Sequence, residues 1–579
     1  MQILKPHFKN YRKEIFLAII TILISAFATL WQPRLLENIQ KAILADNQSV
    51  VLRDGIGLVV LGLLAIIAGI FNVYYAAKIA QGITSDLREE TYAKIQSFSF
   101  GNIEKFSSGS LVVRLINDMN QVMNMMMILF MQLLRMPIIL IGSFVLSIIT
   151  IPQYWWAPVL MLALMMGVGY IVIQNMNKLF AKFQHYMDKI STRVKENLQG
   201  VRVVKSFNQG ENEIKRFNET SDDLNELNIK IGYWISTIMP AFMLIAYLVI
   251  ALVVFLVGRS ANLTTTDVAV VSPYVSYILT LLFAILIGGF VIMNFTRGMV
   301  SLRRIKEVLD TEPDVKFDPN APTGPEKGSI EFDDVSFIYP DGDKPTLKNI
   351  SFKVKPGEMV GIVGATGSGK STLAQLIPRL YDPTEGTIKI GGKDLKTIGE
   401  KSLRNTVSMV LQKAILFSGT IASNLRQGKE DATDYELKRA SEIAQAQEFV
   451  GQYPDQFDHE VEERSANFSG GQKQRLSIAR GVIGQPPILI LDDSTSALDA
   501  KSEKLVQEAL EHDLKDTTTV IIAEKIVSVM NADKILVLDD GKLVAEGTHE
   551  ELLETSPIYQ DIYRTQKAKE KRGEIDEQY

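Results

Sequence analysis

The sequence predicts a multi-domain chain in which an all-α transmembrane domain is fused to an α/β P-loop ATPase domain. Long apolar runs dominate roughly the first 300 of its 579 residues, whereas charged residues, glycines and short alternating segments mix from about residue 310 onward. A glycine-rich phosphate-binding pattern follows a short apolar strand in this second part. A chain of this length is also too long for a single hydrophobic core.

Six apolar runs are long enough to cross a bilayer as helices, since a span needs about 20 residues. They lie near residues 15–33, 55–77, 126–150, 155–175, 234–258 and 270–295. All four tryptophans, at positions 31, 155, 156 and 234, fall at the ends of these runs, where an amphipathic ring sits between headgroups and hydrocarbon. We therefore expect a transmembrane domain over residues 1–308 of a multi-pass integral membrane protein.

The connections between spans two and three and between spans four and five are long and carry many lysines and arginines. The N-terminus is also basic, with Lys5, Lys9, Arg12 and Lys13. Positive charge favours the cytoplasmic side. We expect these long extensions and both termini to be cytoplasmic, in a bacterial cytoplasmic membrane.

Composition excludes several kinds of function. The formal net charge is -5 and no long basic run occurs, which argues against a nucleic-acid partner. The absence of cysteine excludes disulfides, thiolate catalysis and cysteine-ligated metals.

Arg135 is the one charged residue within the six runs, and it lies between Gln132 and Pro137. A charge at this depth is costly unless it faces protein or water, so Arg135, Gln132 and Met131 are candidates for a substrate path. The alternative is a structural arginine bonded to carbonyls freed by Pro137. Methionines crowd the same stretch; their flexible thioethers suit varied apolar ligands, and ordinary packing is again the alternative.

A proline-rich connector is predicted over residues 309–328, followed by a soluble domain over 329–565 and a charged C-terminal tail over 566–579. The soluble domain contains a short buried strand that runs into Gly364-Ala365-Thr366-Gly367-Ser368-Gly369-Lys370-Ser371, followed by Thr372 and a helical pattern. This turn fits the P-loop pattern G-x-x-x-x-G-K-[ST]. Glycines let backbone N–H groups wrap a phosphate chain, Lys370 would reach the β- and γ-phosphates, and Ser371 would ligate magnesium. The pattern predicts that ATP and Mg²⁺ bind here.

A second signal is the apolar segment 486–491, which ends in Asp492. A carboxylate at the end of a buried strand is suited to hold magnesium through a water molecule. As evidence for a nucleotide site this motif is weak alone, but together with the P-loop it is strong.

Between these two motifs lies Asn467-Phe468-Ser469-Gly470-Gly471-Gln472, and here the chain resembles the ATP-binding cassette (ABC) transporters. The family signature is LSGGQ, from which this version departs only by Phe468 in place of leucine. A serine and two glycines that begin a helix form an anion site. In this family that site, here Ser469, Gly470, Gly471 and Gln472, closes over the γ-phosphate bound to the other subunit's P-loop.

The resemblance implies further roles along the chain. Tyr339 corresponds to the aromatic residue that stacks on adenine, Gln412 to the glutamine that touches magnesium, and Ser496 to Asp499 resembles the loop that contacts the partner's site. Magnesium would then be held by Ser371, Gln412 and, through water, Asp492. The cytoplasmic extensions resemble those of type IV exporters, in which short helices dock on the cassettes, one of them on the partner's.

Two positions depart from the family pattern. After Asp492 the family has a glutamate that polarises the attacking water, whereas this chain has Asp493, which is one methylene shorter. A carboxylate that lies about 1 Å farther from the reacting water can lower the rate on the order of a hundredfold. After Ile521-Ile522-Ala523 the family has a histidine that bonds the γ-phosphate, whereas this chain has Glu524, which cannot donate that bond when ionised. We expect the site built on this chain's P-loop to bind ATP but to hydrolyse it slowly or not at all, because its catalytic positions carry the impaired replacements Asp493 and Glu524.

These features lead to one expected function and two alternatives. The chain is expected to be one subunit of a heterodimeric, multidrug-exporter-like pair that uses ATP to export drug- or lipid-like amphipathic molecules. Its partner would be a non-identical half-transporter that keeps the catalytic glutamate and histidine. The alternatives are a slow homodimeric exporter and an ATP-binding regulatory or gating subunit that does not pump.

Overall fold

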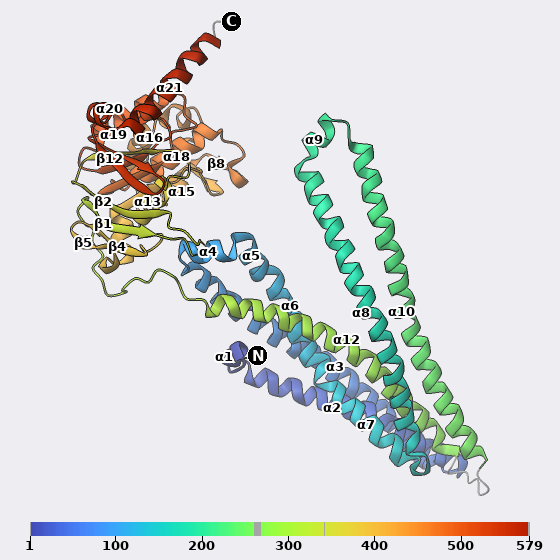
Figure 1. Cartoon of the computed structure of the whole chain (residues 1–579). Helices are drawn as coiled ribbons and strands as arrows, with labels where there is room; N and C mark the ends of the chain where they lie inside the picture. The colour runs from blue at the N-terminus through green and yellow to red at the C-terminus, as the bar shows by residue number, and fades with distance from the viewer. Residues whose placement is uncertain (1, 260–267, 341, 577–579) are drawn as a thin grey trace. The chain divides into compact units, whose positions relative to one another are not determined.

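The computed structural model describes residues 2–259, 268–340 and 342–576, and it divides into two compact units (Figure 1). Unit 1 comprises Met1–Gln96 and Gly109–Thr311, and unit 2 comprises Ser97–Ser108 and Glu312–Tyr579. The predicted transmembrane domain, 1–308, included residues 97–108, which the structure groups with the C-terminal part. The reason is a set of hydrogen bonds: Asn102 accepts from the backbone N–H of Asp314 at 3.1 Å and donates to the carbonyl of Glu312 at 3.2 Å.

Unit 1 holds six helices that are long and apolar enough to cross a membrane, counted over the described residues. They cover Arg12–Leu44, Gln48–Gln96, Ser108–Thr150, Pro152–Gln199, Gly210–Gly258 and Val271–Asp310. The first five contain the predicted spans in full, and the sixth begins one residue after the predicted start at 270. The short α1 (Lys5–Phe8) precedes α2 (Arg12–Leu44) and α3 (Gln48–Gln96).

The third span is not one uniform α-helix. It consists of α5 (Ser108–Val113), the π-helical η2 (Arg114–Asp118), α6 (Met119–Ile128), the π-helical η3 (Leu129–Leu133) and α7 (Arg135–Thr150). Within η3 the N–H of Leu134 bonds the carbonyl of Leu129, five residues back, at 3.2 Å. Pro137 has no N–H to offer the carbonyl of Leu133, so the helix widens by one residue before it.

Hydroxyl side chains inside the spans bond to carbonyls of their own helix. Thr29 donates to Ser25 at 2.9 Å, Ser147 to Phe144 at 2.7 Å, and Thr280 to Ser276 at 2.7 Å. Because hydrocarbon offers no alternative partner, these local bonds allow polar residues to remain in an apolar helix.

Packing within unit 1 pairs α2 with α3, and α6 and α7 with α12 (Val271–Asp310). Met125 and Met126 are fully buried in a cluster that also holds Ile79 and Leu302. The methionine-rich stretch therefore serves ordinary packing at these two positions. Gly298 of α12 lies so close to α6 that an added Cβ would be 2.3 Å from the Cβ of Met125.

Helices α8 (Trp156–Gln199) and α10 (Gly210–Gly258) pack along each other as a hairpin with α9 (Val201–Ser206) at its tip (Figure 1). Large apolar side chains at this tip are exposed: Leu198, Val203, Phe207 and Ile214. The tip lies outside the predicted spans, so lipid does not account for this exposure.

Unit 2 is built on three sheets. A six-stranded sheet has the order β12-β11-β3-β10-β9-β6, a four-stranded antiparallel sheet has the order β2-β1-β4-β5, and β7 pairs with β8. The strands are β1 (Ile330–Phe337), β2 (Leu347–Val354), β3 (Met359–Gly364), β4 (Glu385–Ile390), β5 (Lys393–Asp394), β6 (Val407–Val410), β7 (Gly419–Thr420), β8 (Glu460–Val461), β9 (Ile488–Asp492), β10 (Thr518–Ile522), β11 (Lys534–Asp539) and β12 (Lys542–Gly547).

The central strands of the larger sheet are buried on both faces. In β9, Leu489 and Leu491 point into one core, whereas Ile488 and Ile490 point into the other. A strand covered on both sides is a continuous apolar run rather than an alternating one, which is the pattern of residues 488–491.

The helices of unit 2 are α4 (Phe100–Phe106), α13 (Lys370–Leu376), α14 (Glu400–Thr406), α15 (Ile421–Leu425), α16 (Asp434–Ile443), α17 (Gln447–Val450), α18 (Gly470–Val482), α19 (Ala500–Asp513), α20 (His549–Thr555) and α21 (Pro557–Asp576). The predicted start of the tail at residue 566 falls inside α21. Residues 577–579 of that tail lie outside the described residues.

Replacement of Gly298 tests the contact between α6 and α12. We expect Gly298→Ala to destabilise unit 1 by about 1–3 kcal/mol, because the new methyl group collides with the main-chain side of Met125 and cannot be relieved by a rotamer change. Gly289→Ala is the control on the same helix, since nothing lies within 4 Å of its added Cβ. Thermal unfolding of the detergent-solubilised chain measures both; equal melting temperatures for the two variants would contradict the close packing.

Candidate functional site

The candidate site lies where four parallel strands end. Strands β3, β10, β9 and β6 are neighbours and run in the same direction, so their carboxyl ends share one edge of the sheet. The glycine-rich turn follows β3, Glu524 follows β10, Asp492 ends β9, and Gln412 follows β6. Open α/β sheets bind ligands at such an edge.

A cavity of about 250 Å³ opens at this edge. Its lining contains most of the nucleotide-binding residues predicted from the sequence: Thr366, Gly367, Gly369, Lys370, Ser371, Thr372, Gln412, Asp492, Asp493 and Glu524. Two further lining residues, Thr346 and Ile522, were not predicted. Thr346 precedes β2 and enters from the other sheet, so no local pattern marks it, whereas Ile522 could have been found as the last residue of β10.

The glycine-rich turn has the backbone that its sequence requires. Gly367 and Gly369 have φ values of +84° and +99°, in the left-handed region that favours glycine. Lys370 donates from Nζ to the carbonyls of Gly364 and Ala365, each at 2.9 Å. Ser368 Oγ is buried and has no hydrogen-bond partner within the described part of the chain. The turn thus fits a phosphate chain, which would supply acceptors to both side chains.

The charge balance of the cavity centres on Lys370. Burial lowers the pKa of Lys370, and the carboxylates of Glu524, Asp492 and Asp493 oppose that shift. Burial also raises the pKa of Asp492, partly offset by the hydrogen bond from Ser371. One buried ammonium group therefore faces three acidic side chains.

The residues predicted to hold magnesium fit that ion. Ser371 Oγ donates to Asp492 Oδ1 at 3.0 Å, which puts a hydroxyl and a carboxylate side by side, and Gln412 lines the same cavity. Across the described residues no group of three or more histidine, aspartate or glutamate side chains could hold a metal alone. Mg²⁺ keeps water and phosphate oxygens as ligands, so one hydroxyl and one carboxylate suffice.

Asp493 has a constrained position. Its φ is +46°, and its backbone N–H donates to the carbonyl of Ile522 at 2.9 Å. Gln412 Nε2 donates to Asp493 Oδ2 at 3.0 Å. One carboxylate oxygen is therefore already engaged by an amide.

Three predicted residues do not line the cavity: Tyr339, Gly364 and Ser368. The Tyr339 hydroxyl lies 2.9 Å from Thr372 Oγ1 and donates to Gln375 Oε1 at 3.3 Å. The ring is thus turned onto α13, and burial raises the pKa of Tyr339.

Tyr381 links Tyr339 to α4 and was not predicted. Its ring centroid is 5.4 Å from that of Tyr339, and its hydroxyl donates to Glu104 Oε2 at 2.7 Å. Phe100 of α4 also meets Tyr381 edge to face. A continuous set of contacts therefore runs from Thr372 in the cavity to α4.

The signature residues lie away from this cavity, at the start of α18. Ser469 Oγ accepts from the N–H of Gln472 at 3.3 Å, and Gln472 Oε1 accepts from the N–H of Ser469 at 2.9 Å. Gly470 and Gly471 form the first turn, and an added Cβ on Gly470 would meet nothing within 4 Å. Phe468, the departure from the family pattern, is buried against Phe449 and Tyr453.

The candidate substrate-path residues lie in unit 1. Arg135 donates from Nη2 to Thr29 Oγ1 of α2 at 3.1 Å, while its Nε has no partner within the described part of the chain. Met131 is partly buried against the core that contains Met125, and the backbone carbonyl of Gln132 accepts from the N–H of Leu134 in the same wide turn. Within the described part of the chain, the hydrogen bond of Arg135 goes to a neighbouring helix and not to the carbonyls before Pro137.

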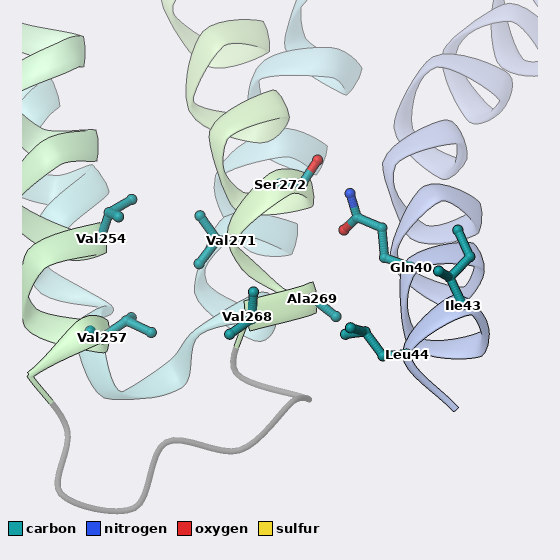
Figure 2. Close-up of a pocket in the computed structure, with 10 residues that line it drawn as sticks. Gln40, Ile43, Leu44, Val254, Val257, Val268, Ala269, Val271 and Ser272 are labelled. Atoms are coloured by element: carbon teal, nitrogen blue, oxygen red, sulfur yellow. The ribbon is translucent and has the colours of Figure 1, made fainter. Parts of the chain in front are cut away.

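A larger cavity, about 500 Å³, lies among the ends of α2, α10 and α12 (Figure 2). Val254, Val257 and Val271 give it apolar walls, and Gln40 and Ser272 bring polar atoms to it. Sequence reasoning missed it, because its lining comes from three distant segments.

Six apolar helices joined to a P-loop nucleotide site define a membrane protein coupled to nucleotide binding. The family described as "ABC transporter" matches residues 347–496, and the "ABC transporter transmembrane region" matches residues 15–296. The chain belongs to the ABC transporter family, with transmembrane and ATP-binding domains fused, and is a multi-pass integral membrane protein.

Relatives match along nearly the whole chain. The "uncharacterized ABC transporter ATP-binding protein YfiB" of Bacillus subtilis is 38% identical over 97% of this chain and 98% of its own length. An "ATP-dependent lipid A-core flippase" of Desulfotalea psychrophila is 32% identical over 96% of this chain and 97% of its own. The chain is also similar to a solved structure of a bacterial Atm1-family ABC exporter with ATP bound, with a TM-score of 0.78 at 26% identity over 96% of this chain and 98% of that one.

Replacement of Tyr381 tests the link between α4 and the nucleotide cavity. We expect Tyr381→Phe to speed amide hydrogen exchange of residues 100–106 about tenfold, because it removes the bond to Glu104, while the Kd for ATP stays within about twofold. Tyr435→Phe, at an exposed tyrosine of the same unit, is the control. Unchanged exchange in α4 would show that the ring contacts alone hold it.

Proposed function

We propose that this chain is one half of an ATP-driven exporter whose own nucleotide site binds ATP but hydrolyses it poorly. The observation that carries the proposal is the meeting of Asp493 and Glu524 with Lys370 in one cavity. Asp493 is one methylene shorter than the family's glutamate, and its carboxylate is held by Gln412. Glu524 adds negative charge near the lysine where the family has a hydrogen-bond donor.

The intact signature segment supports a second part of the proposal, namely a non-identical partner. Ser469 and Gln472 order the start of α18, with Gly470 open to an approaching ligand. Such a segment would complete the active site of a partner that keeps the catalytic glutamate and histidine. The asymmetric pair would then turn over at the partner's P-loop.

The hairpin of α8 and α10 supports assembly with another chain. Phe207 and Leu198 are about 70% exposed at its tip, at 71% and 68%, and leaving them in water costs free energy. A cassette of the partner would cover them. The extensions, the tip and both termini would then lie in the cytoplasm.

The cargo is proposed as an amphipathic, drug- or lipid-like molecule. The apolar cavity between α2, α10 and α12 would accept an acyl or ring group, with Gln40 able to bond a polar one. The name of the Desulfotalea relative, a lipid A-core flippase, supports a lipid-like cargo. Nucleotide closure of two cassettes would shift the membrane helices between inward-open and outward-open forms.

An ATPase assay of the full chain in lipid nanodiscs tests the proposal. We expect negligible turnover of the unaltered chain alone and at least about a tenfold rise in the double variant Asp493→Glu with Glu524→His, because a general base and a phosphate donor are restored. Adding Lys370→Met to the double variant is the control and should abolish the gain. Vigorous turnover by the unaltered chain alone would overturn the assignment and favour a homodimer.

The second candidate function is an ATP-binding regulatory or gating subunit without a pumping role, favoured by the same pair of substitutions. Reconstitution with a candidate partner separates the two. In an exporter, altering the partner's catalytic glutamate stops transport, whereas Lys370→Met in this chain only slows it. In a regulator, cargo moves without this chain's membrane helices.

A further inference from the structure

Helix α21 is hydrogen-bonded, through the side chain of Gln566, to the loop that follows β10. Gln566 of α21 donates from Nε2 to the carbonyl of Glu524 at 2.7 Å and accepts at Oε1 from the N–H of Ile526 at 2.8 Å. A single amide thus pairs with the backbone of residues i and i+2, as a neighbouring strand would. The loop it holds carries Glu524 into the cavity lining.

The face of α21 that carries Gln566 is the face that docks on the cassette. Tyr559 is fully buried, and Ile562 and Tyr563 pack against the same core, which gives the spacing i, i+3, i+4. Gln566 stands at i+7, the next position of that stripe. An apolar residue at this position would extend the docking surface of α21. The polar side chain found there makes two hydrogen bonds to the loop instead.

The far end of the loop is held by a different helix. In α19, Gln507 donates to the carbonyl of Ser528 at 3.0 Å, and Glu503 accepts from the Ser528 hydroxyl at 2.6 Å. The side chain of Ile526, whose N–H Gln566 bonds, is buried in the core. The loop is therefore anchored at both ends, and Gln566 holds the end that carries Glu524.

We propose that Gln566 is a positioning residue for the side chain at position 524, so that α21 sets the rate of the chemical step at this cavity. This inference rests on the proposed function in one respect, namely that the side chain at position 524 faces the terminal phosphate of ATP. Loss of the amide would let residue 524 swing relative to Lys370, which should lower kcat without changing how ATP binds. The predicted charged tail, 566–579, thus begins with a residue that holds the loop carrying Glu524.

The test compares two glutamines of one helix. Gln566→Met keeps the length of the side chain and removes both hydrogen bonds, and Gln566→Glu keeps the acceptor for Ile526 but loses the donor to Glu524. Gln560→Met is the matched control: Gln560 donates to the carbonyl of Leu553 at 2.7 Å, so it ties α21 to the end of α20 and does not touch the loop.

The first readout needs neither ATP nor turnover. The chain contains no cysteine, so Lys525→Cys gives one labelling site on the exposed side of the loop. A nitroxide there should show a sharper, more mobile electron paramagnetic resonance spectrum in Gln566→Met and Gln566→Glu than in Gln560→Met. An unchanged spectrum in Gln566→Met overturns the proposal.

The second readout is kinetic, in the background Asp493→Glu with Glu524→His. We expect Gln566→Met to lower kcat about tenfold with KM for ATP within about twofold, and Gln560→Met to lower neither. An equal fall in kcat in Gln566→Met and Gln560→Met, or a rise in KM that matches the fall in kcat, would show that Gln566 only stabilises the fold. Either result would overturn the inference.

The two proposals fail in different ways. If the unaltered chain hydrolyses ATP well, the impaired site is wrong, and the same kinetic comparison is made in the unaltered chain. If neither background hydrolyses ATP, the assignment of Asp493 and Glu524 as the impairing residues is wrong, and the spectrum at position 525 alone decides the role of Gln566.

Discussion

The buried ammonium group of Lys370 is the interaction around which the ATP-binding unit is arranged. Burial pulls the pKa of Lys370 down, and three carboxylates brought by β9 and β10 hold it up. Two carbonyls of the glycine-rich turn fix its position. A nucleotide would bring further negative charge into a cavity that already has an acidic excess, so a divalent cation bound with it would serve charge balance as well as geometry.

Much of this cavity could be predicted from the sequence, because its parts are short motifs attached to strand ends. The pattern from Gly364 to Ser371 marks the end of β3, and the apolar run that ends at Asp492 marks β9. Both strands pair in parallel with β10, which brings their carboxyl ends to one edge of the sheet. Thr346 and Tyr381 could not be found in this way. They reach the site through the second sheet and through ring contacts with distant residues, which leave no local spacing.

The membrane unit shows the same division between local and long-range information. Hydrophobic runs locate all six helices, since length and apolarity are properties of a single segment. The wide turn at η3 could have been foreseen from Pro137, whereas the fully buried Met125 depends on Gly298, more than 170 residues away. The grouping of residues 97–108 with unit 2 likewise depends on Asn102 and the backbone of Asp314.

The apolar tip at α9 has a consequence for biogenesis. A newly made copy without a partner exposes Phe207 and Leu198 at the tip of the hairpin formed by α8 and α10. Chaperones and quality-control proteases act on exposed apolar surface, so in the assembly proposed above a copy without a partner would be removed faster than an assembled one. The cellular level of this protein would then follow the supply of the subunit proposed to cover the tip.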